Sequence, residues 1–191
     1  MNEPPAILIA GIGNIFFGDD AFGCQVASRC AARAWPEGVR AVDFGIRGLD
    51  LAYALVDSTG LTILVDAVDR RAPVGTLFLI RPEVSGDHRP ANFDNHSLQP
   101  EAMLRYAQAL GANVSSVLLL GCQPGPFGEE GMQGGLSPEV EGAVGRALPV
   151  LVQLVDYLRG GGLEDRDLEH FHLPAGLLAP AAVVQPEELQ T

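Results

Sequence analysis

The sequence contains no lysine, so all 12 of its basic side chains are arginines, set against 24 aspartates and glutamates. The resulting formal net charge of −12 argues against a sequence-independent nucleic-acid surface, which needs clustered basic residues. The missing lysines also exclude Schiff-base chemistry and a lysine nucleophile. We therefore expect no nucleic-acid partner.

Long apolar runs and cysteine pairs are missing as well. No apolar stretch approaches the roughly 18–20 residues that span a membrane. The opening residues MNEPPAILIAG lack the basic flank and cleavage site of a signal peptide. We expect a cytoplasmic protein with no membrane partner. Cys24, Cys30 and Cys122 form neither an even disulfide set nor a C-x-x-C pair, and we expect them to be small buried apolar groups.

Strand-like and helix-like patterns alternate along the chain. The expected strands, apolar and rich in branched residues, are 6–11, 38–44, 61–68, 76–82 and 115–123. The expected helices, with apolar residues three and four apart, are 21–35, 49–58, 98–110 and 137–158.

This alternation predicts a single-domain α/β fold with three layers, in which a twisted, mostly parallel sheet of about five strands carries helices on both faces. The link between 61–68 and 76–82 is too short for a helical crossover, so one strand is expected to run antiparallel and the sheet to be mixed. We expect the domain to occupy residues 1–160. Residues 161–191, rich in glycine, proline and acids, are expected to form a mobile or surface-wrapping extension.

The stretch LIAGIGNIFFGDDAFG, residues 8–23, begins like a nucleotide-binding loop. Phe16 stands where the third glycine of G-x-G-x-x-G would be, and Asp19-Asp20 replace the lysine and hydroxyl of a Walker loop. Two carboxylates would repel a phosphate by several kcal/mol at about 4 Å, so the loop suits a cation better. The structural alternative is that Asp19 or Asp20 merely caps the next helix.

Asp66 interrupts an apolar strand near its carboxyl end, where a charge is unfavourable unless it is paired or bound to a cation. If the first and third strands are neighbours, Asp20 and Asp66 converge at the carboxyl edge of the sheet. With His96 they would complete an O,O,N set with open positions, which suits nickel or zinc. The alternatives are a strand-end Asp66 that bonds the backbone of the next turn and an exposed loop His96.

Six motifs in order give the chain a family resemblance. They are GIGNIFFGDDAFG, DFGIRGLDL, ILVDAVD followed by PVGTLFLI, NHSL, and GCQPGPFGEEGMQGGLSPEV. Together they resemble the hydrogenase maturation endopeptidases from residue 6 to about residue 158. The resemblance implies a cytoplasmic endopeptidase that removes a short C-terminal extension from the large-subunit precursor of a [NiFe] hydrogenase after nickel insertion.

The resemblance also implies roles for particular residues. The acid that recognises nickel falls on Asp20, the second acid on Asp66 and the histidine on His96, which makes these three the expected catalytic and metal-binding residues. Asp43, which leads the turn from Gly45 to Gly48, is expected to position the substrate. The nickel is expected to arrive with the precursor, which would be the partner of a monomeric enzyme.

Two other functions stay open at this point. The same three residues could hold nickel in a non-catalytic maturation chaperone. The strand-glycine-helix opening also fits a small nucleotide-binding α/β protein, although the acidic pair opposes it. Serine and cysteine nucleophiles are disfavoured, because the sequence has no G-x-S-x-G elbow and no cysteine in a recognisable catalytic context.

Overall fold

A computed structural model describes residues 6–58, 60–82, 100–126, 135–160 and 183–184. The strands are β1 (Ile7–Ile12), β2 (Val39–Gly45), β3 (Leu61–Ala67), β4 (Leu77–Ile80), β5 (Val117–Cys122) and β6 (Val183–Val184). The α-helices are α1 (Phe22–Ala31), α2 (Gly48–Val56), α3 (Pro100–Ala109) and α4 (Pro138–Arg159), and short 3-10 turns lie at Gly18–Ala21 and Val114–Ser116.

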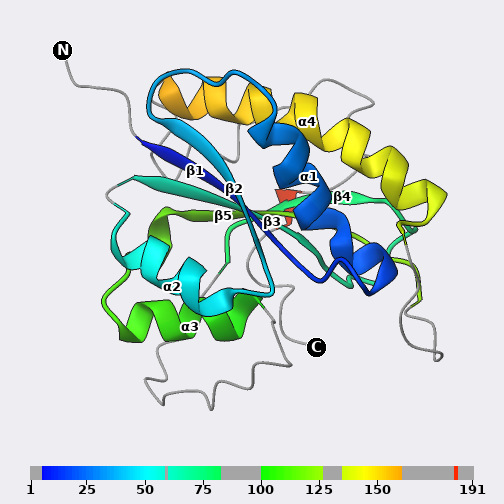
Figure 1. Cartoon of the computed structure of the whole chain (residues 1–191), viewed down its shortest axis with the longest axis horizontal. Helices are drawn as coiled ribbons and strands as arrows, with labels where there is room; N and C mark the ends of the chain where they lie inside the picture. Colours follow the sequence, from blue (N-terminus) through cyan, green and yellow to red (C-terminus); the bar gives the residue numbers. More distant parts are fainter. Residues whose placement is uncertain (1–5, 59, 83–99, 127–134, 161–182, 185–191) are drawn as a thin grey trace.

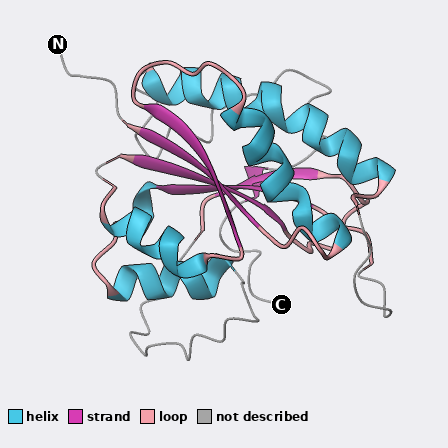
Figure 2. Ribbon diagram, in the orientation of Figure 1, coloured by secondary structure: helices cyan, strands magenta, loops and turns pink. Residues whose placement is uncertain are grey.

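The strands form one sheet in the order β2-β1-β3-β5-β4-β6. Helices α1 and α4 cover one face, and α2 and α3 cover the other (Figures 1 and 2). The predicted three-layer α/β fold is confirmed, because the sheet carries helices on both faces. No described helix has the length and apolar character needed to cross a membrane.

The mixed character of the sheet is also confirmed. Strands β2, β1, β3 and β5 are parallel, whereas β4 runs antiparallel to β5, with Leu77 opposite Cys122. The short β3–β4 link therefore does not make a hairpin, since β5 lies between the two strands. The two-residue strand β6 pairs with β4 and was not predicted from the sequence. The division at residue 160 stays a prediction.

The first helix is shorter than the predicted 21–35 and ends at Ala31. The Trp35 indole Nε1 donates a hydrogen bond to the Cys30 carbonyl at 2.8 Å, and the Arg33 N–H donates to the same carbonyl at 3.0 Å. Pro36 comes next, and a proline disfavours the helical conformation of the residue before it, here Trp35. These local bonds replace the last helical turn that the apolar spacing suggested.

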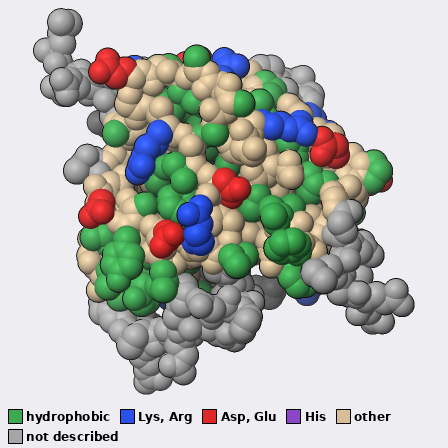
Figure 3. Space-filling model, viewed as in Figure 1, with side chains coloured by type: hydrophobic (Ala, Val, Ile, Leu, Met, Phe, Trp, Pro, Cys, Tyr) green, Lys and Arg blue, Asp and Glu red, His purple; other side chains and the backbone are tan. Residues whose placement is uncertain are grey.

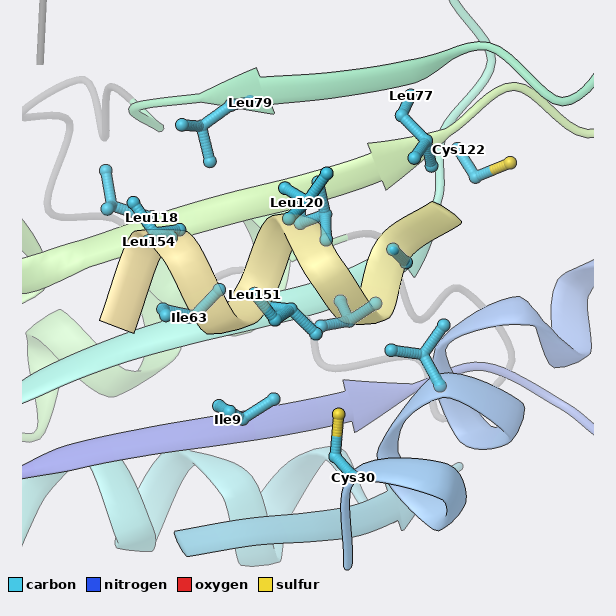
Figure 4. Packing of buried hydrophobic residues seen from close by; sticks show 14 of the residues in the cluster. Ile9, Cys30, Ile63, Leu77, Leu79, Leu118, Leu120, Cys122, Leu151 and Leu154 are labelled. Atoms are coloured by element: carbon cyan, nitrogen blue, oxygen red, sulfur yellow. The ribbon is translucent and has the colours of Figure 1, made fainter. Parts of the chain in front are cut away.

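Between α4 and the sheet, the core consists of aliphatic side chains with two of the three cysteines. Figure 4 shows Leu151 and Leu154 of α4 facing Ile9, Ile63, Leu118 and Leu120 of the central strands, with Cys30 and Cys122 at the margin of the cluster. All three cysteines are free and buried, as expected.

Two glycines let α1 lie against the strands at unusually short range. A Cβ built on Gly23 would lie 2.1 Å from the Val65 carbonyl oxygen and 2.2 Å from that of Ile12. A Cβ on Gly11 would lie 2.2 Å from the Gly23 carbonyl oxygen. Only glycine at these two positions permits this approach, which fixes the start of α1 above the carboxyl ends of β1 and β3.

Substitution of Gly23 tests this contact. Gly23→Ala should lower the free energy of unfolding by about 3 kcal/mol or more, because the added methyl overlaps two backbone oxygens. Gly145→Ala is the matched control, because its Cβ would meet nothing within 4 Å on an exposed part of α4. Alanine there should stabilise the helix by roughly 0.5–1 kcal/mol. Urea unfolding measures the free energy of unfolding of both variants. Equal changes in the two would contradict the close contact between α1 and the strands.

Candidate active site

The carboxyl ends of β1 and β3 meet near the centre of the sheet, where the strand order reverses. From β1 the chain passes through α1 to β2 on one side of β1, whereas β3 and the strands that follow it lie on the other side, so this is the topological switch point at which open α/β sheets bind ligands. The first and third strands are neighbours, as the convergence of Asp20 and Asp66 requires, with Gly11 of β1 opposite Val65 of β3.

Asp20 and Asp66 lie on either side of Gly13 at this point. Gly13 has a φ of +134°, and a Cβ there would lie 1.9 Å from the Asp20 carbonyl oxygen and 3.8 Å from Asp66 Oδ1. Glycine is therefore required by both the backbone conformation and the lack of space. The structure brings the two predicted carboxylate residues together.

Asp66 is 4% exposed at the end of an apolar strand. Its Oδ1 accepts a hydrogen bond from the Ala67 N–H at 2.8 Å, and Ala67 still belongs to β3 rather than to the turn that follows. Burial raises the pKa of Asp66 well above its ordinary value, the charge of Asp20 raises this pKa further, and the Ala67 hydrogen bond lowers it only in part.

Asp20 is partly exposed, and its carboxylate closes the turn that follows β1. The Asn14 N–H donates to Asp20 Oδ2 at 2.8 Å, and the Asp20 N–H donates to the Phe17 carbonyl at 3.1 Å. Burial raises the pKa of Asp20, and the hydrogen bond from Asn14 opposes that shift.

Burial disfavours the charged form of both carboxylates, the charge of Asp20 disfavours that of Asp66 further, and no basic side chain among the described residues acts on either pKa. A cation placed between them would relieve both the burial of charge and the mutual repulsion, whereas a phosphate would add to them. The donor set thus fits a metal ion. The described residues contain no group of three or more metal-ligating side chains, and His96 lies outside the described residues.

Asp43 lies near the carboxyl end of the edge strand β2, beside this pair. Its Oδ1 accepts a hydrogen bond from the Gly45 N–H at 2.9 Å, and Gly45 has a φ of +54°. The Gly45 carbonyl in turn accepts from the Gly13 N–H at 3.2 Å, so the two glycine turns are joined directly. Gly48 begins α2 as a buried residue. The structure thus places Asp43 at the rim of the site, and its role in positioning substrate stays a prediction.

Cys24 also lies among these acids, which the sequence reasoning missed. Its Sγ lies 3.5 Å from the Gly13 carbonyl oxygen, to which the thiol donates. Burial, first, and then the negative charges of Asp43, Asp20 and Asp66 raise the pKa of Cys24 to about 12. The thiol therefore stays protonated at neutral pH. The sequence offered one signal for this position: Cys24 is four residues after Asp20, a spacing that places two residues on the same face of a helix.

Asp19 has a different role from the helix capping that the sequence allowed. Neither the 3-10 turn nor α1 has a side-chain cap, so capping by Asp19 is wrong. Its carboxylate instead accepts from the Gly125 N–H at 2.8 Å, the Ser137 N–H at 2.6 Å and the Ser137 hydroxyl at 3.0 Å. Ser137 is itself the N-cap of α4, accepting from the Val140 N–H. No local sequence pattern could identify partners more than a hundred residues away.

The raised pKa values predict how stability depends on pH. Because the folded state holds protons on Asp66 and Asp20 more tightly than the unfolded state, stability falls as pH rises from the ordinary aspartate pKa of about 3.9 through the raised values. Asp66→Asn removes one buried charge and keeps an oxygen acceptor for Ala67. We expect this variant to be more stable than the parent at pH 7, by about 1 kcal/mol or more.

The gain should shrink as the pH falls toward 4 and disappear below the ordinary aspartate pKa of about 3.9, where Asp66 becomes protonated in both states. Thermal unfolding between pH 4 and pH 8 measures this difference. Asp57→Asn, at an exposed position, is the control and should change stability by less than about 0.5 kcal/mol at every pH. An Asp66→Asn protein that is less stable than the parent at all pH values would show that the buried charge of Asp66 does not destabilise the fold.

Comparison with known proteins agrees with this geometry. The family model for hydrogenase maturation proteases matches residues 24–154. The chain is 33% identical over 164 residues to the hydrogenase expression/formation protein HupD of Rhodobacter capsulatus, covering 85% of this chain and 75% of the relative.

Solved structures give the same picture. The hydrogenase 2 maturation peptidase of Thaumarchaeota archaeon SCGC_AB-539-E09 is 30% identical with a TM-score of 0.58, covering 78% of this chain and 97% of the other. The hydrogenase maturating endopeptidase HybD of Escherichia coli is 26% identical with a TM-score of 0.56, covering 82% and 93%. The family match spans well over half of the chain and agrees with the fold of these structures. The chain therefore belongs to the hydrogenase maturation protease family.

Proposed function

We propose that this protein is an endopeptidase that removes the C-terminal extension of a [NiFe] hydrogenase large-subunit precursor once nickel has been inserted. The observation that carries the proposal is the convergence of Asp20 and Asp66 at the ligand-binding edge of a protease-family fold, where no basic side chain of the described residues acts on either carboxylate. We expect the enzyme to act as a monomer in the cytoplasm.

The nickel belongs to the substrate in this proposal. Asp20 and Asp66, together with His96, would contact the ion that the precursor carries, so that a precursor without nickel is not recognised. Oxygen and imidazole donors suit a borderline first-row metal. A bound divalent ion can polarise a scissile carbonyl or lower the pKa of an attacking water. Because the ion would favour the charged form of both aspartates, it would offset the repulsion between them.

The proposed reaction is direct hydrolysis. The oxygen of a water adds to the scissile carbonyl carbon, the C–N bond breaks, and the departing amine takes the proton that the water loses. Asp20 is the carboxylate that water can reach, whereas Asp66 is buried beneath it. Asp43, at the rim of the site, would orient the peptide that enters.

The chain's own thiols do not favour a covalent route. The pKa values of Cys24 and Cys122 are raised to about 12 and that of Cys30 to about 11, in each case chiefly by burial. Since the thiolate is the nucleophile, these groups are unreactive at neutral pH. We therefore expect no acyl-enzyme intermediate.

Incubation with nickel-loaded and nickel-free precursor tests the proposal. Intact-mass analysis should show loss of a C-terminal peptide from the nickel-loaded form only. Asp20→Ala should slow this loss at least about 100-fold, because it removes a group that contacts the reacting centre. Asp57→Ala, an exposed aspartate away from the site, is the matched control and should process normally. Nickel binding without cleavage of any cognate precursor would favour the chaperone function instead.

A further inference from the structure

Several large apolar side chains are exposed around the candidate active site. Phe16 is 60% exposed, Ile46 59% and Tyr53 56%, and three further residues are between 39% and 54% exposed. We call the set the apolar strip: Ile15, Phe16, Phe17, Ile46, Leu49 and Tyr53. Single exposed apolar residues are ordinary on a protein surface, but contiguous groups of them mark interaction sites.

The members of the strip come from three segments that meet at this edge of the sheet. The loop that holds Ile15–Phe17 and the loop that holds Ile46 are joined by the hydrogen bond from Gly13 N–H to the Gly45 carbonyl, 3.2 Å long. Leu49 and Tyr53 are four residues apart on α2 and so share one helix face. Figure 3 shows hydrophobic surface over α2 and near the loop that precedes α1 on the same face.

The loop presents its apolar side chains through a closed network of hydrogen bonds. The Phe16 N–H donates to Asn14 Oδ1 at 3.0 Å, and the Phe17 N–H donates to the Asn14 carbonyl at 3.1 Å. Asn14 is in turn held by Asp20, whose carboxylate accepts its N–H at 2.8 Å. The strip and the candidate catalytic carboxylate therefore belong to one structural unit, and whatever covers the strip lies beside Asp20.

The charges near the strip indicate a nonpolar partner. Arg47 and Asp50 lie between its members in the sequence and pair with each other at 3.7 Å, so their charges offset one another. A membrane surface is disfavoured, because interfacial helices use basic residues to meet anionic lipids, and this chain has no lysine and a net charge of −12.

We propose that the apolar strip docks a nonpolar surface of the precursor that lies next to its C-terminal extension. This inference rests on the proposed function, because it assigns the partner from the strip's continuity with the catalytic carboxylate. Burial of the strip supplies affinity for the folded precursor, while the carboxylates act on the scissile bond. The strip thus contributes to KM without touching the scissile bond, so its loss should spare kcat, whereas the carboxylates take part both in contacting the nickel and in the chemistry.

Steady-state processing of nickel-loaded precursor tests the docking surface. Phe16→Ser and the double change Ile46→Ser with Leu49→Ser should each raise KM about tenfold or more and leave kcat within about twofold. Phe16→Leu should restore most of the loss. Leu110→Ser is the matched control, because Leu110 is an exposed apolar residue beyond the end of α3 and outside the strip. Circular dichroism melts should show that all variants fold.

An unchanged KM for Phe16→Ser, or an equal rise for Leu110→Ser, would overturn the proposal. It would also be overturned if KM stayed unchanged while Phe16→Ser dissolved a dimer of the parent in sedimentation velocity, or abolished its binding to phosphatidylserine vesicles. Those results would assign the strip to a second copy of the chain or to a lipid surface.

Binding measured without turnover separates this inference from the proposed function. Asp20→Asn retains an oxygen acceptor for the Asn14 N–H and should still bind the precursor. Adding Phe16→Ser to that variant should weaken binding about tenfold or more. If the parent protein does not cleave the precursor but binds it through the strip, the proposed function fails and the docking surface stands. If cleavage occurs and neither KM nor binding depends on the strip, the proposed function stands and the docking surface fails.

Discussion

The contact between α1 and the two central strands determines the position of the other groups at the carboxyl edge. Gly11 and Gly23 allow backbone to meet backbone, so the start of the helix lies directly over Ile12 and Val65. Cys24 follows at once on the inner side of the helix, and Asp20 precedes it in the turn. Because protein interiors are close-packed, a helix lifted by a single methyl group would carry these residues away from Asp66. The local shape of the site therefore depends on Gly11 and Gly23 having no side chain.

The electrostatics of the site oppose folding rather than support it. Asp66 is buried beside Asp20, and no cationic side chain among the described residues compensates for its charge. Clusters of this kind occur where a ligand rather than the protein supplies the opposite charge, and functional sites commonly accept such a loss of stability. The apolar layers on both faces of the sheet provide the stability that permits it.

Much of this arrangement follows from the sequence, because apolar periodicity determines which segments form strands and which form helices. The same patterns, with the short link after Asp66, predicted that one strand runs antiparallel, and the structure shows that this strand is β4. The usual strand order of such folds predicted that Asp20 and Asp66 converge. The bonds of Asp19 to Ser137 and the position of Cys24 against Asp43 depend on tertiary packing, which local propensity does not encode. The end of α1 was misjudged because Trp35 takes a carbonyl that the helix would otherwise use. The contribution of His96 and the involvement of nickel stay predictions.

The bonds made by Asp19 have a consequence for how the connection between β5 and α4 can vary. One carboxylate holds both Gly125, just after the strand, and Ser137, at the start of the helix. Since the two ends of the intervening segment are pinned to the same point, its length is decoupled from the geometry of the sheet and of α4. The relative placement of β5 and α4 is therefore determined by the Asp19 carboxylate rather than by the residues that connect Gly125 to Ser137.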